Sequence, residues 1–413
     1  MLFLYNFIIH IAYFFLKIIA LFNPKMKLFI AGRKKTFEKL SDIEKNDKVF
    51  WIHAASLGEF EQGIPIIEKL KQTYTNHKVV VSFFSPSGYE IRKHYSLADV
   101  VCYLPFDTRK NVKKFIKQIH PDIAIIIKYE FWPNLLHELK STNTKTILVS
   151  GIFRDNQLFF KPYGKWMRSF LPAFNHFFVQ NQKSKELLQT INFKNVTVSG
   201  DTRFDRVAKI LHQNNQLNFI EDFKDNTYTV VAGSTWIEDE NLIVNYINSI
   251  SAVDEKFIIA PHTMDQNKIK ELRKSIQRKA ILFSEKDNVN LKDFDVLIID
   301  TIGLLTKIYA YADVAYVGGG LATGLHNTLE PATFGIPVVF GGNMYQKFNE
   351  AKDLLKVGGG KTVLTKEDFL NVFLELKNNI EYRNQMGTAA GNYVQNNTGA
   401  TQLVMDYITK HNN

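Results

Sequence analysis

The sequence predicts an α/β protein with two doubly wound parallel sheets, preceded by a membrane-anchoring segment. Short, almost continuously apolar runs alternate with helical stretches from residue 48 onward. Such runs are typical of parallel strands that helices cover on both faces. A polar segment, residues 212–226, interrupts the alternation once, which indicates two halves. The first 22 residues form one apolar stretch whose single charge is Lys17.

Length and charge limit the possible functions. A chain of 413 residues fits two or three domains at roughly 150 residues per domain. A single cysteine, Cys102, excludes an intramolecular disulfide framework and a Cys-rich zinc site. The net charge of +10 favours nucleic acid, anionic lipid or phosphorylated substrates as partners. Because the first 35 residues hold six cations and no acid, the rest carries only +4, and we expect no nucleic-acid binding.

The amino-terminal segment is predicted to attach the protein to a membrane. A spanning helix needs about 20 apolar residues, and residues 1–22 barely reach that length. A cleaved secretory signal fits poorly, because the charges follow the apolar run and no small-residue cleavage site is present. Asn23-Pro24 ends the helix, and the cations from Lys25 to Lys35 suit the anionic cytoplasmic leaflet. Three interpretations stay open: a single span with a cytoplasmic body, a monotopic interfacial helix, and a buried core helix.

The body is predicted to contain twelve strands in two domains. Those of the first half are 49–56, 79–85, 100–106, 123–128, 146–151, 176–181 and 196–201. Those of the second half are 229–234, 256–262, 296–300, 314–320 and 337–342. Helical patterns include 60–72 and 111–118, and the tail from Lys366 is mostly helical. The predicted organisation is an anchor at 1–35, a domain at 36–211, a linker at 212–226 and a domain at 227–413, whose last helix is a candidate to cross back. We expect the two domains to face each other across a cleft.

The loop after the first strand offers a candidate general base. Ser56 and Glu59 have the spacing of a capping box, so Glu59 could simply satisfy the backbone of its own helix. The alternative is a partly desolvated carboxylate, beside Leu57 and Phe60, that accepts a proton from a hydroxyl group. Gly58 would allow a bulky substrate to approach the backbone.

A second carboxylate follows the fourth strand. Glu130 comes after a buried run and before Trp132-Pro133, a rigid aromatic turn. It could be a solvated loop residue beside a packed tryptophan. The functional alternative is a carboxylate that faces the same cleft as Glu59 and orients an acceptor or a basic partner.

The second half carries a glycine-rich loop and a polar motif. Three glycines, 318–320, end a strand and could allow close backbone approach to a phosphate or a sugar, although they form neither G-x-G-x-x-G nor a P-loop. Asn327 and Glu330 have helix-capping spacing. Alternatively, Glu330 accepts hydrogen bonds from ribose hydroxyls while the helix amino terminus faces a phosphate.

Two weaker loops complete the candidate rim of the second half. Ser234 and Thr235 offer hydroxyls before a helix, which suits an anion, although capping is the commoner use of such residues. His262 ends a strand, where a lone histidine is more often structural. No H-E-x-x-H, C-x-x-C or D-x-D cluster occurs in the sequence, so we expect no bound metal.

Taken together, these motifs resemble the 3-deoxy-D-manno-octulosonate (Kdo) transferase family over essentially the whole chain. The motifs are H-A-A-S-L-G-E at 53–59, E-F-W-P-N at 130–134, S-G-D-T-R-F-D at 199–205, A-G-S-T at 232–235, D-T-I-G at 300–303, Y-A-Y-A-D-V-A-Y-V-G-G-G at 309–320 and H-N-T-L-E-P-A-T-F-G-I-P-V-V-F-G at 326–341. The first and last of them are specific to that family. The apolar anchor and the basic stretch that follows it belong to the same resemblance.

The resemblance implies a GT-B fold and an inverting transfer of Kdo that needs no metal. The donor is implied to be CMP-Kdo, which is a co-substrate, and no cofactor is implied. The acceptor is implied to be a phosphorylated glycolipid of the lipid IVA type at the inner membrane, in lipopolysaccharide biosynthesis. Glu59 matches the proposed catalytic base and Glu130 a second important glutamate.

Further residues are assigned through the same resemblance. Donor binding is implied for Asn327 and Glu330 and for the backbone around Ile302-Gly303, and we add the rim residues Ser234, Thr235, His262, Gly319 and Gly320. On the acceptor and membrane side we place Ser56, Gly58, Arg33, Lys34 and Lys35.

The sequence departs from the family pattern at three places. His262 stands where the family usually has arginine, Ser150-Gly151-Ile152 where it commonly has N-A-R, and Leu304 where an acidic residue often follows. Arg154 or Arg203 could compensate. One rival is a GT-B transferase or an epimerase that uses a UDP-sugar. Another is a non-catalytic membrane-anchored protein that binds nucleotide or lipid, in which Glu59 only caps a helix.

Overall fold

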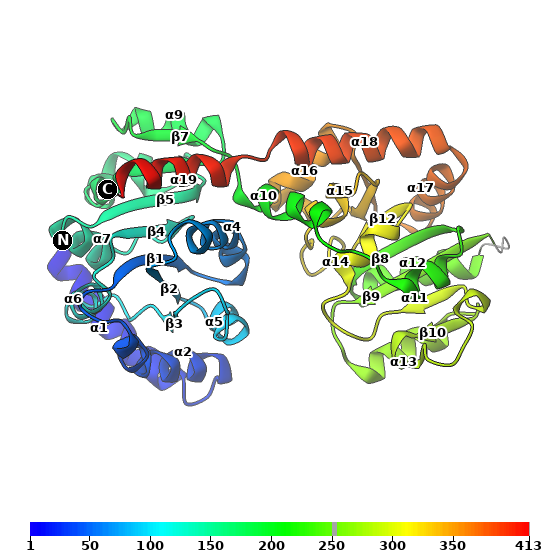
Figure 1. Ribbon diagram of the computed structural model, residues 1–413, viewed down its shortest axis with the longest axis horizontal. Coiled ribbons are helices and arrows are strands. Elements are labelled where there is room, and N and C mark those ends of the chain that lie inside the picture. The colour runs from blue at the N-terminus through cyan, green and yellow to red at the C-terminus, as the bar shows by residue number, and fades with distance from the viewer. Residues whose placement is uncertain (250–253, 413) are drawn as a thin grey trace. The chain divides into compact units, whose positions relative to one another are not determined.

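The computed structural model describes residues 1–249 and 254–412. The chain divides into two compact units: unit 1 contains Met1–Arg206 and Thr398–Asn413, and unit 2 contains Val207–Asn397. Each unit holds a seven-stranded sheet whose paired strands are all parallel, with helices on both faces (Figure 1). The predicted α/β class with two doubly wound parallel sheets is therefore confirmed.

The sheet of unit 1 contains all seven strands that the sequence predicts. They are β1 (Lys48–Ala54), β2 (His77–Phe83), β3 (Val100–Tyr103), β4 (Ile123–Ile127), β5 (Lys145–Gly151), β6 (His176–Val179) and β7 (Val196–Val198), in the order β3-β2-β1-β4-β5-β6-β7. Their apolar runs are continuous because both faces are buried. In β1, Val49 and Trp51 enter the core on one face, and Phe50 and Ile52 enter it on the other.

Helices from distant parts of the chain cover the two faces of this sheet. On one face, α4 (Leu57–Thr73) packs with α19 (Ala400–His411), which brings Val404 and Ile408 into unit 1 from the end of the chain. On the other face lie α6 (Arg109–Ile119) and α7 (Pro133–Ser141). The remaining α-helices of unit 1 are α1 (Leu2–Ile19), α2 (Pro24–Lys34), α3 (Thr36–Lys39), α5 (Pro86–Arg92), α8 (Lys165–Arg168), α9 (Gln182–Thr190) and α10 (Thr202–Ala208), whose last two residues lie beyond the unit boundary.

Unit 2 contains the five predicted strands and two that the sequence did not reveal. Its strands are β8 (Tyr228–Thr235), β9 (Glu255–Pro261), β10 (Ala280–Leu282), β11 (Val296–Ile298), β12 (Val314–Val317), β13 (Val338–Gly341) and β14 (Gly360–Val363), in the order β10-β11-β9-β8-β12-β13-β14. The two missed strands, β10 and β14, lie at the two edges of the sheet, and each has residues that are only partly buried.

The α-helices of unit 2 fill both faces of its sheet. They are α11 (Asn218–Lys224), α12 (Ile237–Ser249), α13 (Gln266–Ser275), α14 (Leu305–Ile308), α15 (Leu329–Thr333), α16 (Asn349–Lys356), α17 (Lys366–Asn378) and α18 (Ile380–Asn396). Apolar side chains of α12, α13 and α17 pack on one face, and those of α11 and α14 pack on the other.

The expected linker at 212–226 differs from the structure. This segment contains α11, and its Ile220 and Phe223 are fully buried in the core of unit 2. The polar residues around them hid two core positions from sequence inspection. The boundary between the units lies after Arg206.

The amino-terminal helix α1 lies against unit 1 but is not part of its core. Tyr5 donates a hydrogen bond to Asp107 Oδ2 (2.7 Å), and Asn134 Nδ2 donates one to Asn6 Oδ1 (2.9 Å). Tyr13 stacks on Phe106 with ring centroids 4.7 Å apart. None of the residues of α1 is buried, so the interpretation as a buried core helix is wrong.

Candidate active site

The two glutamates singled out in the first half follow neighbouring strands. In unit 1 the strand order reverses direction between β1 and β4, which pair with each other. Ligands of doubly wound sheets bind at such a switch point, beyond the carboxyl ends of the strands. Glu59 lies in the first turn of α4, directly after β1, and Glu130 lies in the loop after β4. The topology therefore brings the two carboxylates to one place.

Two hydrogen bonds hold the carboxylate of Glu130. His53 Nε2 lies 3.1 Å from its Oε2, and Trp132 Nε1 donates to the same oxygen at 2.6 Å. The side chain of Glu130 is only 12% exposed. Burial acts to raise the pKa of Glu130, but the hydrogen bonds and the charge of His53 outweigh it, so this pKa is lowered. Glu130 is not a solvated loop residue.

His53 is a site residue that sequence inspection did not single out. It is fully buried in β1, and its Nδ1 lies 2.9 Å from Ser82 Oγ and 3.0 Å from the Ser82 carbonyl oxygen. Trp51 Nε1 donates to the same Ser82 hydroxyl at 2.8 Å. These contacts fix the imidazole so that Nε2 points to Glu130. A polar residue amid an apolar strand was the available signal, because a buried histidine needs partners.

Glu59 has a backbone contact and an unusual electrostatic environment. Its Oε2 accepts a hydrogen bond from the Ala55 amide at 2.8 Å. Ser56 is the N-cap residue, but its side chain makes no capping hydrogen bond, and the hydrogen bond of Glu59 goes to Ala55, the residue before the cap, so the spacing does not produce the expected capping box. Burial, and then the charge of Glu130, raise the pKa of Glu59, against the opposing charge of Lys128 and the Ala55 hydrogen bond. A raised pKa suits a carboxylate that takes up a proton.

The surroundings of Glu59 are open on one side and apolar on the other. Leu57 is half-buried and Phe60 is fully buried, which gives the apolar wall predicted from the sequence. A β-carbon placed on Gly58 would meet nothing within 4 Å, so the space above this turn is open. The glycine is therefore not required by the fold of unit 1.

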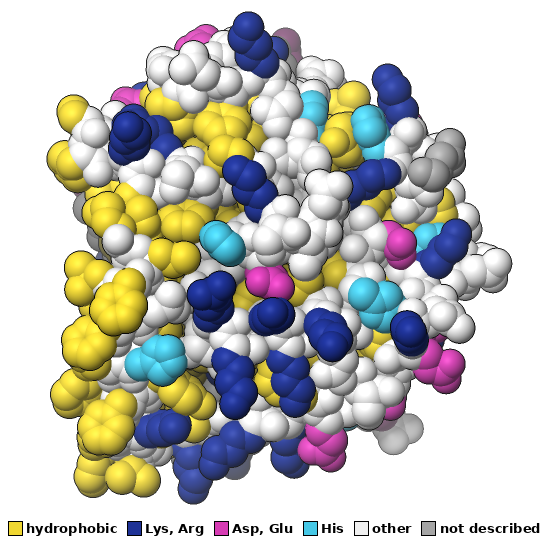
Figure 2. Space-filling model, turned by 90° about the vertical axis from the view of Figure 1, so that its left-hand side faces the viewer, with side chains coloured by type: hydrophobic (Ala, Val, Ile, Leu, Met, Phe, Trp, Pro, Cys, Tyr) yellow, Lys and Arg dark blue, Asp and Glu magenta, His cyan; other side chains and the backbone are white. Residues whose placement is uncertain are grey.

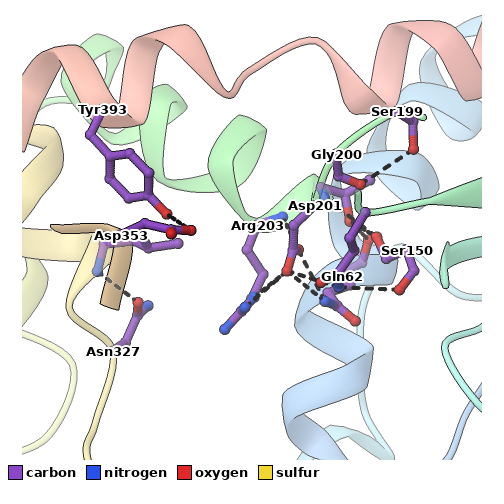
Figure 3. A network of polar contacts seen from close by, with 12 residues as sticks. Gln62, Ser150, Ser199, Gly200, Asp201, Arg203, Asn327, Asp353 and Tyr393 are labelled. Atoms are coloured by element: carbon purple, nitrogen blue, oxygen red, sulfur yellow. Dashed lines mark hydrogen bonds and ion pairs between the residues drawn. The ribbon is translucent and has the colours of Figure 1, made fainter. Parts of the chain in front are cut away.

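A second polar network lies next to the switch point. Gln62 Nε2 donates to both carboxylate oxygens of Asp201, at 3.0 and 2.9 Å, and Gln180 Nε2 donates to Oδ2 at 3.1 Å. Arg203 adds hydrogen bonds from Nε and Nη2 to the same oxygen, at 3.0 and 2.8 Å (Figure 3). Burial acts to raise the pKa of Asp201, but Arg203 outweighs it, so the pKa is lowered. Arg203 is thus held in place by a buried carboxylate.

The backbone is strained where the strands of this edge end. Lys128 after β4 and Ser150 in β5 have positive φ angles, of 61° and 53°. Non-glycine residues adopt this conformation at a cost, and such residues cluster at functional sites. The charge of Lys128 lowers the pKa values of both Glu59 and Asp201, so one cation acts on both polar networks. Sequence inspection did not identify Lys128.

In unit 2, the candidate donor residues also gather at a switch point. The strand order reverses between β8 and β12, which pair with each other. Ser234 in β8 has a positive φ of 55°, and Thr235 Oγ1 donates to Glu240 Oε1 at 3.0 Å. The glycine loop follows β12, and the Gly319 amide donates to the buried Asp239 at 2.8 Å.

The glycines after β12 are explained in part by protein packing. A β-carbon at Gly320 would lie 2.4 Å from the Gly341 carbonyl oxygen, and one at Gly318 would lie 2.3 Å from the Ser234 carbonyl oxygen. Here the close backbone approach is to other strand ends of the same unit. Gly319, with φ of 85°, allows the turn itself.

Asn327 and Glu330 interact directly. Asn327 Nδ2 donates to Glu330 Oε1 at 3.0 Å, while its Oδ1 accepts the Leu329 amide hydrogen bond at 3.1 Å. Thr306 Oγ1 donates to the other oxygen of Glu330 at 2.8 Å. The asparagine therefore does satisfy the helix start, and it also positions the glutamate. Thr306 is a partner that the sequence did not reveal.

His262 belongs to a stack of three rings. Its ring centroid lies 4.7 Å from that of Trp236 and 4.4 Å from that of His326, and the rings are close to parallel. Trp236 Nε1 donates to His326 Nε2 at 3.0 Å. Burial and the neighbouring His262 lower the pKa of His326 to about 4, and burial lowers that of His262. His262 is thus held by aromatic packing.

Not every candidate joins these networks. Ile302 is 80% exposed, and a β-carbon on Gly303 would meet nothing within 4 Å, so this loop is open to solvent. Among the residues that the structure describes, no group of three or more His, Cys, Asp or Glu side chains is arranged to hold a metal ion.

Arg33 corrects an expectation about the membrane side. Lys34 and Lys35 are exposed, but Arg33 is only 6% exposed. Helical periodicity places it with Phe29 and Ile30 on the face of α2 that packs on unit 1. Its guanidinium donates to the carbonyls of Phe29 (3.0 Å) and Phe84 (2.7 Å) and lies over the Phe29 ring at 3.5 Å. It cannot contact a membrane surface from there.

Sequence comparisons find homologues of this chain among the Kdo transferases. Residues 31–206, which include both glutamates and His53, match the family model described as 3-deoxy-D-manno-octulosonic-acid transferase (kdotransferase). A 3-deoxy-D-manno-octulosonic acid transferase of Aquifex aeolicus is 29% identical over 350 residues, which are 83% of this chain and 90% of that protein. The chain is thus homologous to Kdo transferases, and these homologues indicate a glycosyltransferase.

A further relative is also named a glycosyltransferase, and a solved structure shares the fold. A bifunctional glycosyltransferase/methyltransferase of Fusobacterium nucleatum is 26% identical over 366 residues, or 86% of this chain, and the match spans only 56% of that protein's length. The UDP-GlcNAc 2-epimerase of Neisseria meningitidis, solved with UDP-GlcNAc, superposes with a TM-score of 0.60 at 14% identity, covering 88% of this chain and 100% of that one. This likeness shows the fold alone, and it agrees with the GT-B architecture expected of the family.

Proposed function

We propose that this protein transfers Kdo from CMP-Kdo to a phosphorylated glycolipid of the lipid IVA type, in lipopolysaccharide biosynthesis, with Glu59 as the general base. The observation that carries this proposal is the pair of carboxylates at the switch point of unit 1. Glu130 is held ionised by His53 and Trp132, and the pKa of Glu59 is raised. Two neighbouring carboxylates with opposite pKa shifts are a common basis for acid–base chemistry.

The proposed chemistry is a direct displacement at the anomeric carbon of Kdo. A hydroxyl of the acceptor loses its proton to Glu59 while its oxygen forms the new bond to that carbon. The bond from the carbon to the phosphate oxygen breaks, and CMP leaves with the electron pair. Attack from the face opposite to the leaving group inverts the configuration. CMP is a good leaving group, so we propose that the reaction needs no metal and no cofactor.

The donor is proposed to bind to unit 2. Ser234 and Thr235 after β8, the glycine loop after β12, and Asn327 with Glu330 are arranged around one switch point. Ligands of such sheets occupy this position. Glu330 is held by Asn327 and Thr306, which leaves its carboxylate ready to accept hydrogen bonds from ribose hydroxyls. Ile302 and Gly303 are proposed to contact cytidine from their open loop.

We further propose that α1 attaches the enzyme to the inner membrane, with the body on the cytoplasmic face. Helix α1, over Leu2–Ile19, is long and apolar enough to cross a membrane by length and composition. However, Tyr5 and Asn6 tie it to unit 1 through Asp107 and Asn134, and its outer face exposes Phe3, Phe7 and Phe14, among others. A spanning helix would have to give up the polar contacts near its start. An interfacial position keeps them and buries the exposed aromatic side chains in lipid.

Cations next to α1 support this placement. Helix α6 begins two residues after Asp107, and its exposed face carries Arg109, Lys110, Lys113, Lys114 and Lys117 without an acidic residue. None of the ion pairs in the described part of the chain involves these five side chains. Figure 2 shows hydrophobic side chains along one edge of this side of the molecule and Lys and Arg side chains gathered beside them. An apolar and a cationic surface side by side suit an anionic bilayer.

The experiment that tests the proposed function is Kdo transfer from CMP-Kdo to lipid IVA by the wild type and by Glu59→Gln. Loss of a general base is expected to lower kcat by about 100-fold or more. Glu186→Gln, on an exposed face of α9, is the matched control and should retain full activity. Active Glu59→Gln enzyme would reject Glu59 as the base. Absence of any product from the wild type would reject the proposed reaction.

The same assay separates the rival functions. A transferase or epimerase that uses a UDP-sugar should be inhibited by UDP more strongly than by CMP, whereas the proposed enzyme should show the reverse. A non-catalytic membrane-anchored binding protein would bind nucleotide or lipid without forming product.

A further inference from the structure

A pocket of unit 1 opens directly beside Glu130. It has a volume of about 310 Å³, and its walls include Glu130, Trp132, Leu158, Phe159 and Met167. This volume is at the lower end of the range for ligand sites, which also combine apolar walls with a few polar groups. The pocket therefore fits part of a ligand whose reactive group lies at the carboxylates.

The apolar wall of the pocket continues toward helix α1. Met167 lies in α8, and the ring of its neighbour Trp166 is 5.8 Å from the ring of Tyr5 in α1, measured between centroids. Leu158, which lines the pocket, is 52% exposed. An apolar surface thus runs from the carboxylate of Glu130, along α8, to the helix that we place in the bilayer interface.

Cations flank the same segment. Between residues 154 and 168 the chain carries Arg154, Lys161, Lys165 and Arg168 and one acid, Asp155. Lys161 directly follows the turn that holds Leu158 and Phe159, and the exposed Lys165 starts α8. An apolar wall that ends at a carboxylate and is bordered by lysines matches a molecule with acyl chains, a sugar and phosphates.

We infer that this pocket is the acceptor site, in which the sugar of an acylated, phosphorylated glycolipid lies at Glu130 and Glu59 while its acyl chains run along Leu158 and Met167 toward α1. Lys161 and Lys165 bind the phosphate groups. The sugar of the acceptor then reaches the two carboxylates while its acyl chains stay in contact with the bilayer. This inference rests on the proposed function, because it names the acceptor's position in that reaction.

The test compares two acceptors: lipid IVA and its fully deacylated, water-soluble form. Leu158→Asn and Met167→Gln should each raise the KM for lipid IVA roughly tenfold, which corresponds to about 1.4 kcal/mol. The KM for the deacylated acceptor should change less than twofold. Leu403→Asn, which alters an exposed leucine on α19, is the matched control and should change neither KM. CMP binding should be equal in all four proteins.

A second pair of variants tests the cations. Lys161→Gln combined with Lys165→Gln should raise the KM for lipid IVA and leave that for a dephosphorylated acceptor unchanged. Lys185→Gln combined with Lys194→Gln removes two charges elsewhere in unit 1 and should have no effect.

The outcomes separate this inference from the proposed function. If the wild type makes no Kdo product, the proposed function fails. If the wild type is active but Leu158→Asn and Met167→Gln keep the wild-type KM for lipid IVA, the reaction stands and the pocket is not the acceptor site. Equal losses on both acceptors would mean that the substitutions damage the fold, and would also overturn the inference.

Discussion

Nε2 of His53 lies 3.1 Å from Oε2 of Glu130, and this contact joins the middle of unit 1's sheet to the loop that follows its neighbouring strand. The imidazole is fully buried and held from its other side by Ser82. Glu130 is therefore fixed by a group that cannot move without disturbing β1 and β2. In the proposed reaction, the charge of this carboxylate adds to burial in raising the pKa of the base, Glu59.

His53→Gln should separate the hydrogen bond of His53 from its charge. Glutamine can still donate to Glu130, but it cannot become positive, so the pKa of Glu130 should rise. We expect kcat to fall by roughly tenfold and the protein to remain folded. The measurement is Kdo transfer across pH 5 to 9, with the intact circular dichroism spectrum as a control. A rate equal to that of the wild type would show that the charge of His53 plays no part.

The pH dependence of transfer should report Glu59. The base must be deprotonated, and its pKa is raised above the ordinary value of 4.5, so kcat/KM should rise with pH and level off only above that raised pKa. Glu130→Gln removes a neighbouring negative charge, which is one cause of the shift. The acidic limb of the profile should therefore move to lower pH in this variant, whatever happens to the maximal rate. If the acidic limb of the Glu130→Gln profile stays at the wild-type pH, the charge of Glu130 does not raise the pKa of Glu59.

Asp107, which accepts the Tyr5 hydrogen bond, should make the stability of unit 1 depend on pH. Burial raises the pKa of Asp107 from 3.8 to about 7, against the opposing hydrogen bonds from Tyr5, Asn134 and Leu135. Between the two pKa values, the folded protein binds the proton of Asp107 more tightly than the unfolded chain does. This contribution to the free energy of unfolding is present below about pH 4 and is lost as the pH rises toward 7.

Urea unfolding of the wild type and of Asp107→Asn, in the same detergent, measures this contribution. The variant cannot titrate at this position. We expect the stability of the wild type relative to the variant to be greater at pH 5 than at pH 8. A difference that does not change with pH would contradict the prediction.

The cationic face of α6 should contribute to membrane binding. Each lysine near an anionic surface adds about 1 kcal/mol, so Lys110→Gln, Lys113→Gln and Lys117→Gln together should weaken binding by at least tenfold. The measurement is sedimentation of the full chain with vesicles of 70% phosphatidylcholine and 30% phosphatidylglycerol. Lys270→Gln, Lys274→Gln and Lys356→Gln remove the same charge from unit 2 and serve as the control. Equal binding of both triple variants would exclude a specific role for α6.

The periodicity of the sequence was sufficient to predict the fold class. Strands that helices cover on both faces need continuous apolar runs, and twelve such runs marked twelve of the fourteen strands. The missed strands, β10 and β14, lie at the edges of their sheet and are only partly buried, so they do not need a continuous apolar run. The position of Glu59 and Glu130 after strands was also visible, because in a parallel sheet the carboxyl ends of all strands meet at one edge.

The partners of these residues could not be read from the sequence, because they come from distant parts of the chain. His53 reaches Glu130 across 77 positions, and Tyr5 reaches Asp107 across 102. Ile220 and Phe223 lie in a segment whose polar composition indicated a linker, but burial against the sheet of unit 2 makes them core residues.

Local patterns in the sequence were therefore enough to predict the two α/β units, the apolar amino terminus and the family motifs. Which side chains are buried together depends on the folded chain. The tertiary structure placed Arg33 inside unit 1 and not at its surface, held α1 against the body, and joined His53 to Glu130. The physical reason is that burial and hydrogen bonding, which set the pKa values of these groups, depend on neighbours that only the folded chain brings together.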